Sequence, residues 1–207
     1  MKKLILLLFL SINSFAQTTD RVVKIHSLIP EIDAKFEAFR TQNHLSSVSY
    51  AILVDGKIIH QTNSGIVNYK TNKSADNQSV YRIASMSKSF ASVAILQLRD
   101  AGKLKLDDPV WKYIPELKGQ KYSKDSPEIT VRHLLTHAAG FPEDNPWGDR
   151  QLGISEAEML KMFKKGISFS NEPGVAYEYS NMGFAMLGQI IKNVSGQSYQ
   201  SYIINKI

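Results

Sequence analysis

The sequence predicts an α/β (α+β) domain in which helices pack on an antiparallel sheet that later strands would complete. Residues 47–54 and 57–64 are apolar-rich and are joined by Asp55-Gly56, a dipeptide typical of two-residue hairpins. An isolated hairpin is only marginally stable in water, and its free edge invites pairing with other chains. No other segment is a convincing strand, so we expect the hairpin to belong to a larger sheet. The alternative is a helical domain that carries one hairpin.

The first residues have the pattern of a secretory signal. A lysine pair precedes the apolar run of residues 4–10, and Ser14-Phe15-Ala16 provides a small-x-small cleavage site before Gln17. The apolar run is shorter than the roughly 20 residues that a membrane-spanning helix needs. We therefore expect residues 1–16 to be a signal peptide, and the protein to be periplasmic or secreted, with no stable membrane span after cleavage.

Composition narrows the class of protein further. The chain has 207 residues and no cysteine, which excludes disulfides and a lipid-modified cysteine. Removal of residues 1–16 takes away two lysines and lowers the formal net charge from +6 to +4. The remaining lysines are scattered and are not interleaved with aromatic residues, so no nucleic-acid partner is expected. The length of residues 17–207 allows one sizeable core and does not require two domains.

Helical periodicity predicts two of the longer helices. Residues 33–42 form an N-terminal helix, with Ile32, Phe36 and Phe39 at helical spacing. Residues 86–98 are dense in apolar residues, and Gly102 follows where a glycine commonly ends a helix. This second helix opens a mostly helical insert that covers about residues 86–195.

Capping residues predict the other helices of the insert. Pro109 suits the first helical position of a segment at 110–113, and Thr130 can cap a short helix through residue 135. Ser155 and Glu158 form a capping box ahead of residues 159–165, and Gly166 ends that helix. A last helix covers residues 184–194.

Ser85 is the candidate nucleophile. Lys88 stands three residues later, and on a helix this spacing places the two side chains on one face, where an amine can activate a hydroxyl. Of all the serines in the chain, only Ser85 has a lysine at this spacing. At the first turn of a helix the backbone N–H groups also favour the oxyanion of an acyl intermediate. The alternative is an N-cap serine followed by a surface lysine.

Tyr179 is the candidate base, in the tripeptide Tyr179-Ser180-Asn181. A phenol whose pKa is near 10 is a weak base at neutral pH, so the chemistry needs a nearby lysine cation such as Lys88 to favour the phenolate or to shuttle the proton. The alternative for Tyr179 is a half-buried aromatic residue that packs beside Tyr177.

Four stretches, residues 81–88, 134–142, 172–174 and 179–183, give the chain its family resemblance. In letters they read YRIASMSK, LLTHAAGFP, EPG and YSNMG. In this order and at this spacing, the chain resembles the serine beta-lactamase and penicillin-binding-protein superfamily, closest to its branch of class C beta-lactamases, DD-peptidases and esterases. The resemblance covers nearly the whole mature chain and implies a beta-lactamase/transpeptidase-like fold.

The resemblance also implies a role for each candidate residue. Ser85 would be the acylated nucleophile, and Lys88 its proton acceptor or electrostatic partner. Tyr179 would be the general base and then the general acid. Asn181 would be a substrate-binding residue. It would orient either Lys88 or the amide of the substrate. No cofactor is implied.

One part of the family pattern is missing after Tyr179. The family has a Lys-Thr-Gly or His-x-Gly on a late strand, which faces the nucleophile. Here the only later lysines, Lys192 and Lys206, are followed by other residues. We therefore expect residues 17–207 to be an incomplete, C-terminally truncated domain that lacks the last strands.

His133 and His137 lie four residues apart, a spacing that can place two imidazoles on one metal. No third ligand accompanies them, so no metal site is expected, and His137 is expected to fix the turn before Gly140 through hydrogen bonds. We expect the polar loop of residues 143–150 to line the cleft, with Trp147 either a substrate platform or a lid over the helical insert.

The sequence thus predicts an exported serine hydrolase that forms a Ser85 acyl-enzyme from an amide, ester or beta-lactam carbonyl. Its partner would be a small molecule or a peptide derived from peptidoglycan. Beta-lactams, D-amino peptides and simple esters all remain open as substrates, since they present a carbonyl to the same groups. The alternative is a catalytically inactive truncated remnant or a cell-wall binding module.

Overall fold

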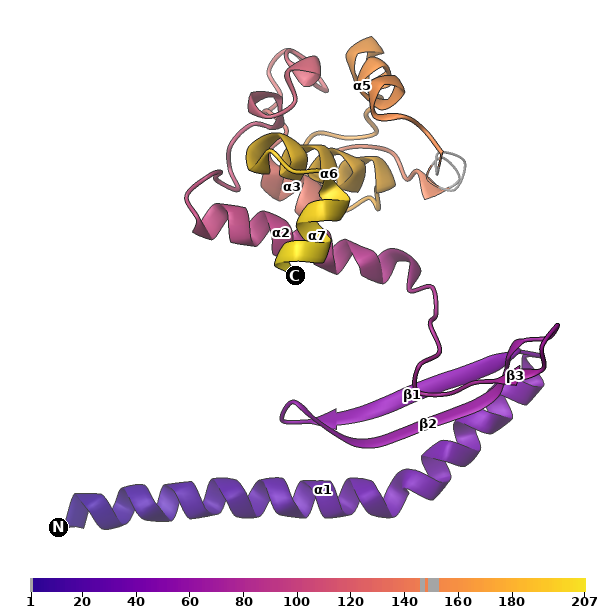
Figure 1. Ribbon diagram of the computed structural model, residues 1–207. Coiled ribbons are helices and arrows are strands. Elements are labelled where there is room, and N and C mark those ends of the chain that lie inside the picture. The colour runs from indigo at the N-terminus through magenta and orange to yellow at the C-terminus, as the bar shows by residue number, and fades with distance from the viewer. Residues whose placement is uncertain (1, 146–147, 149–152) are drawn as a thin grey trace. The chain divides into compact units, whose positions relative to one another are not determined.

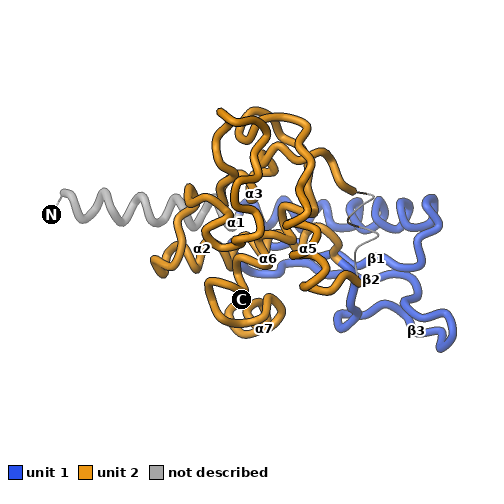
Figure 2. Tube along the Cα trace, turned by 90° about the horizontal axis from the view of Figure 1, so that it is seen from above, with its two compact units in different colours: residues 1–82 blue, residues 83–207 orange. Residues whose placement is uncertain are grey.

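The computed structural model describes the backbone of residues 2–145, 148 and 153–207, and side chains from residue 20 onward. The chain divides into two compact units, residues 1–82 and residues 83–207, shown in two colours in Figure 2. The first unit holds the hairpin. In the described part of the second, the regular elements are helices joined by loops.

A long helix opens the first unit. This helix, α1, spans Lys2–Gln42, and Pro30 lies inside it. Figure 1 shows that α1 is bent, as expected when a proline removes one hydrogen bond of a helix. The helix predicted at residues 33–42 is only its last part. The leucine-rich segment of residues 4–10 also favours a helix. The prediction did not join this segment and residues 33–42 into one helix.

The sheet of the first unit has three antiparallel strands in the order β1-β2-β3. β1 spans Ser47–Val54, β2 spans Lys57–Asn68 and β3 spans Lys73–Ser74. The predicted turn is confirmed: Asp55 and Gly56 have φ values of 49° and 76°, the pair of positive angles that a type I′ turn requires. The prediction that no other segment is a strand was wrong for β3, whose two residues are too few for a periodic signal.

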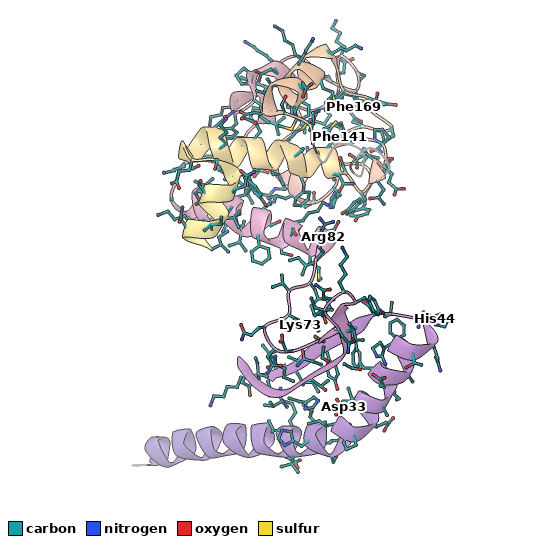
Figure 3. All side chains as sticks on the ribbon, turned by 45° about the vertical axis from the view of Figure 1, so that its right-hand side comes forward. Asp33, His44, Lys73, Arg82, Phe141 and Phe169 are labelled. Atoms are coloured by element: carbon teal, nitrogen blue, oxygen red, sulfur yellow. The ribbon has the colours of Figure 1, made fainter. Side chains whose placement is uncertain are left out.

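One side of this sheet is covered by α1. Phe36 stacks on Tyr50 with the ring centroids 4.0 Å apart. Asp33, labelled in Figure 3, accepts a hydrogen bond from the Tyr50 hydroxyl at 2.6 Å and lies 2.9 Å from His60 Nε2. Burial and the Asp33 contact raise the pKa of Tyr50 to about 12. The helix thus supplies part of the second layer that the hairpin was expected to need.

The second unit begins with a short 3-10 helix, η1 (Ala84–Ser87), followed by α2 (Lys88–Asp100). α2 ends as predicted. Gly102 has a φ of 70°, the N–H of Lys103 donates to the Leu98 carbonyl, and the N–H of Gly102 donates to Arg99. These are the two bonds of a Schellman motif.

Six further helices follow α2 in the described residues. They are η2 (Val110–Lys112), η3 (Pro115–Leu117), α3 (Val131–Leu135), α5 (Glu156–Lys165), α6 (Asn181–Ser195) and α7 (Tyr199–Lys206). The predicted Thr130 cap of α3 and the predicted capping box of α5 are both present, and at α3 the side chain of His133 completes a second capping box. The expectation for Pro109 was wrong, because this residue is the extended N-cap of η2 rather than its first helical residue. α7 and η3 were not predicted.

The core of the second unit forms where α6 packs on α2, with α3 and α7 beside them (Figure 1). Small residues on α2, Ala91 and Ala94, are buried in the same cluster as the larger Leu187 and Ile190 of α6. Alanines allow two helices to approach closely, and this approach positions the first turns of both helices for contact. Among the described residues, no helix is both long enough and apolar enough to cross a membrane.

Candidate active site

Ser85 lies in η1, and the last residue of this turn, Ser87, directly precedes the first residue of α2. Ala84, its preceding neighbour, has a φ of 45°, in the left-handed region that alanine rarely adopts. Such backbone strain persists only where the surrounding structure holds it, and it is concentrated at functional sites. The sequence predicted Ser85 in the first turn of an α-helix. The structure places it in a 3-10 turn that leads into that helix.

Tyr179 and Asn181 flank the start of α6. Ser180 is the N-cap residue, and its Oγ accepts a hydrogen bond from the backbone N–H of Gly183 at 2.9 Å. Asn181 is therefore the first residue of the helix, and Tyr179 lies directly before the N-cap, in the loop that leads into the helix. The cap fixes the backbone on which both side chains stand.

Lys88 is the centre of the site. Its Nζ donates hydrogen bonds to Tyr179 Oη at 2.6 Å, to Asn181 Oδ1 at 2.7 Å and to Ser85 Oγ at 3.1 Å. Ser85 Oγ and Tyr179 Oη lie 2.5 Å apart. The structure thus brings all four predicted site residues into one hydrogen-bonded cluster, and all four belong to the second unit.

The phenol of Tyr179 is under opposing influences. Burial raises its pKa, whereas the hydrogen bonds from Lys88 and Ser85 and the positive charge of Lys88 lower it. The lowering influences prevail, so the pKa of Tyr179 lies below its ordinary value of 10.0. A lysine amine beside the phenol is the arrangement that a tyrosine base requires.

Asp144 supports the site, a role that the sequence analysis did not predict. Its carboxylate accepts hydrogen bonds from the backbone N–H of Asn181 at 2.6 Å, from the N–H of Met182 at 2.7 Å and from Ser180 Oγ at 2.9 Å. A carboxylate at a helix N-terminus pairs the free N–H groups and complements the helix dipole. Asp144 is separated from these partners by more than thirty-five residues, so no local pattern predicts the contact.

The second and third stretches of the family resemblance lie against each other. The N–H of Gly174 donates to the Ala138 carbonyl at 2.8 Å, and the N–H of Ser170 donates to the Gly140 carbonyl at 2.9 Å. Gly140 has a φ of 79°, and a Cβ there would lie 2.2 Å from the carbonyl oxygen of Asn171. Only glycine fits this position, so the two stretches form one tightly packed support beside the site.

His133 and His137 do not act together. His133 Nδ1 accepts from the backbone N–H of Thr130 at 3.3 Å, which caps α3. His137 Nδ1 accepts from the backbone N–H of Ser180 at 3.0 Å. The turn before Gly140 is therefore held by a hydrogen bond of His137, as expected, and the partner in this bond is the tyrosine motif. Within the described ranges, no three His, Cys, Asp or Glu side chains are grouped as a metal would require.

The remaining sequence expectation concerned the loop of residues 143–150. Asn145 Oδ1 accepts from Asn181 Nδ2 at 3.3 Å, so the first part of this loop contacts the site. Trp147 lies outside the described residues.

Comparison with known proteins gives a consistent family match. Residues 32–207 match the family model described as Beta-lactamase. Protein flp of Staphylococcus aureus (strain NCTC 8325 / PS 47) is 33% identical over 182 residues, which cover 84% of this chain and 35% of that protein. The chain therefore spans about a third of the length of this curated relative.

Solved structures give the same picture. The octameric penicillin-binding protein homologue from Pyrococcus abyssi has a TM-score of 0.74 at 29% identity, covering 86% of this chain and 42% of that one. A class C beta-lactamase has a TM-score of 0.75 at 24% identity, covering 87% of this chain and 48% of that one. These matches confirm the predicted fold class, a mixed α/β beta-lactamase/transpeptidase-like fold, of which the chain spans about half.

Proposed function

Because this chain belongs to the beta-lactamase family, we propose that it is a serine hydrolase that forms an acyl-enzyme on Ser85. The observation that carries the proposal is the hydrogen-bonded cluster in which Tyr179 Oη lies 2.5 Å from Ser85 Oγ and 2.6 Å from Lys88 Nζ. A nucleophile, a base and a cation that stabilises the base in its ionised form meet within direct hydrogen-bonding distance.

Acylation follows from this geometry. The Tyr179 phenolate takes the proton of Ser85 Oγ, and the oxygen attacks the substrate carbonyl carbon to form a tetrahedral oxyanion. The start of α2 lies beside Ser85, and the positive end of the helix dipole favours that oxyanion. As the oxyanion collapses, the bond to the leaving nitrogen or oxygen breaks. Tyr179 then returns its proton to the leaving group, which leaves an ester on Ser85.

Deacylation uses the same groups in the same order. The Tyr179 phenolate takes a proton from a water molecule, and the resulting hydroxide attacks the ester carbonyl. When the second tetrahedral intermediate collapses, the bond between the carbonyl carbon and Ser85 Oγ breaks, and Tyr179 protonates Oγ. The product is a free carboxylic acid, and the site returns to its starting protonation state.

Lys88 and Asn181 hold the charge and the orientation. The lysine ammonium stabilises the phenolate through its 2.6 Å hydrogen bond, and Asn181 Oδ1 keeps the ammonium in place at 2.7 Å. The Asn181 amide nitrogen donates one proton to Asn145 Oδ1 at 3.3 Å and has a second proton for a substrate amide. The substrate class we propose is an amide, ester or beta-lactam carbonyl on a small molecule or a peptide derived from peptidoglycan.

A serine-reactive fluorophosphonate tests the proposal in the full natural protein. We expect one covalent adduct, mapped by peptide mass spectrometry to Ser85 and absent from Ser85→Ala. Ser87→Ala is the matched control, because Ser87 lies in the same 3-10 turn and should leave labelling unchanged. Labelling that survives in Ser85→Ala would refute the nucleophile. A protein that folds and stays unlabelled would instead favour the inactive or cell-wall binding alternative.

Three carbonyl substrates then distinguish the activities. A chromogenic cephalosporin, a peptide ending in D-Ala-D-Ala and p-nitrophenyl acetate report lactam, amide and ester cleavage in turn. The ratio of kcat/KM values among the three names the preferred carbonyl.

Export is a separate proposal. Residues 1–16 have the composition of a signal peptide, and the expected mature N-terminus is Gln17. N-terminal sequencing of the protein recovered from the periplasm or medium tests this, with the substitution Ala16→Arg expected to block cleavage.

A further inference from the structure

His137 lies in the turn that follows α3, close to the tyrosine of the site. Its φ is 54°, in the left-handed region, so its backbone is held in a conformation that histidine seldom adopts. The ring is half-buried. This residue is part of no step in the mechanism above.

Contacts from His137 reach the chain on both sides of Tyr179. Its Nδ1 accepts a hydrogen bond from the backbone N–H of Ser180 at 3.0 Å. Its carbonyl oxygen accepts a hydrogen bond from the backbone N–H of Glu178 at 2.8 Å. The residue before the tyrosine and the residue after it are therefore both attached to the same histidine.

The ring of His137 also lies against the tyrosine itself. The centroids of the His137 and Tyr179 rings are 4.6 Å apart, and the planes differ by 28°. Phe184 lies near the same imidazole, with its ring centroid 5.0 Å away. The stacked face limits rotation of the phenol, whose hydroxyl must stay within reach of Ser85 and Lys88.

We propose that His137, as the neutral imidazole that carries its proton on Nε2, is the positioning residue that holds Tyr179 against Ser85 and Lys88. This inference rests on the proposed function, because it assigns a role in the reaction of that same site. His137 acts through Tyr179 and does not contact the reacting carbonyl.

The protonation state of His137 follows from its hydrogen bond. An Nδ1 that accepts from a backbone N–H carries no proton, whereas both nitrogens of an imidazolium are donors. Protonation would place a proton on Nδ1, facing the Ser180 N–H, and would break this hydrogen bond. The bond from the Glu178 N–H to the His137 carbonyl would remain. The contribution of His137 to the reaction should be present above its pKa and lost as the pH falls through it.

The groups that face the imidazole favour its neutral form. Burial lowers the pKa of His137 below 6.5, and the positive charge of Lys88 lowers it further, while the charge of Asp144 acts in the opposite direction. The titratable phenols of Tyr177 and Tyr179 also lie against the imidazole, Tyr177 in an edge contact and Tyr179 stacked. The hydrogen bond from the Ser180 N–H to His137 Nδ1 is therefore intact at neutral pH and breaks only in acid.

Two substitutions separate the contacts of this histidine. His137→Asn retains an oxygen that can accept from Ser180, and asparagine tolerates the left-handed backbone. It has no ring and does not titrate. His137→Phe retains an aromatic face for Tyr179 and has no acceptor. His133→Asn is the matched control, since it removes a second half-buried histidine that caps α3 and does not contact the tyrosine.

The rate of fluorophosphonate labelling at Ser85 is measured from pH 4 to 9 in each protein. Below the pKa of Tyr179, the rate falls in every variant with the fraction of phenolate. In wild type we expect an additional acid limb, a steeper fall with a midpoint below about 6.5, and His133→Asn should keep it. This additional limb should disappear in His137→Asn, which leaves only the dependence on Tyr179. At neutral pH, His137→Phe should react about tenfold more slowly, because the Ser180 N–H is left without its acceptor. An acid limb that is unchanged in His137→Asn would overturn the proposal.

A measurement that does not depend on activity accompanies the rates. The ¹H–¹⁵N resonance of Ser180 should shift with pH, with the same midpoint as the His137 ring protons, and the shift should vanish in His137→Asn. A Ser180 chemical shift that does not change as His137 titrates would refute the hydrogen bond between the two residues, even if labelling is normal. Absence of any labelling in wild type, together with a normal Ser180 titration, would refute the proposed function and leave the attachment standing.

Discussion

Asp144 accepts a hydrogen bond from the backbone N–H of Asn181 at 2.6 Å, and so joins the loop after Pro142 to the first residue of α6. The same carboxylate binds the next N–H, of Met182, at 2.7 Å. The start of the helix that carries Asn181 is thus held by a residue far away in the sequence.

Replacing this carboxylate should loosen both the helix and the site. Asp144→Asn keeps one acceptor oxygen and loses the charge and the second oxygen, so at least one donor at the helix start is left unpaired. We expect the free energy of unfolding to fall by about 1–3 kcal/mol, together with the rate of Ser85 labelling. Thermal and urea unfolding measure the first effect. Glu143→Gln is the control, because Glu143 is exposed and contacts Asn145 instead of α6; equal losses in the two variants would contradict the capping role.

Gly148 lies against the side chain of Asn181. A Cβ at Gly148 would lie 2.6 Å from Asn181 Nδ2 and 2.8 Å from its Cγ. Gly148→Ala should therefore displace the asparagine from Lys88 and reduce the labelling rate by about tenfold or more, because small errors of position are costly in an active site. Gly153→Ala is the control, since a Cβ there meets no atom of the described residues within 4 Å. A Gly148→Ala protein that reacts at the wild-type rate would show that the asparagine can move without loss.

The pKa of Tyr179 depends on Lys88 with a definite sign. Burial alone raises that pKa, and the lysine contributes the hydrogen bond and the charge that lower it. In Lys88→Met the pKa should therefore rise, the phenolate should be scarcer at neutral pH, and the rising limb of the labelling rate should move to higher pH. Rates between pH 6 and 11 measure this, beside Lys103→Met as an exposed-lysine control. A Lys88→Met profile that is lower but not displaced would mean that the lysine acts on Ser85 and not on the phenol.

Two glycines of the sheet offer a matched pair. Gly65 and Gly56 have φ values of 83° and 76°, but only at Gly65 would a Cβ meet backbone, 2.2 Å from the Ser46 carbonyl oxygen. Each alanine substitution should cost about 1 kcal/mol for the strained backbone, and Gly65→Ala should cost more because backbone must shift. Hydrogen exchange of β1 and β2 measures the difference. Equal protection in the two variants would show that the strand accommodates the extra methyl group.

Local signals in the sequence were sufficient for much of the fold. The Asp55-Gly56 turn, the Ser155 capping box and the Gly102 helix end each depend on residues a few positions apart, and each is present. The same holds for the spacing of Ser85 and Lys88, which η1 and the start of α2 bring together.

Contacts between segments that are distant in the sequence could not be predicted from such local signals. The strand β3 has two residues and is defined by its pairing with β2, so it has no periodicity of its own. The bond from Ser180 to His137 joins residues forty-three positions apart. Its donor is a backbone N–H, which every residue other than proline possesses and which therefore leaves no trace in the sequence. Residues that support a site through the main chain are for this reason harder to find than those that carry its chemistry.

The three hydrogen bonds of Lys88 set a limit on what its ammonium group can do. An ammonium has three protons, and these three are directed at Ser85, Tyr179 and Asn181. A substrate oxygen or a water molecule can accept a hydrogen bond from Lys88 only if it displaces one of these three acceptors. If the lysine becomes a neutral amine, only two protons remain and one of the three bonds must reverse or break. The proton inventory of a single nitrogen thus couples the nucleophile, the base and the amide, so that none of them can change its partner without a change at the others.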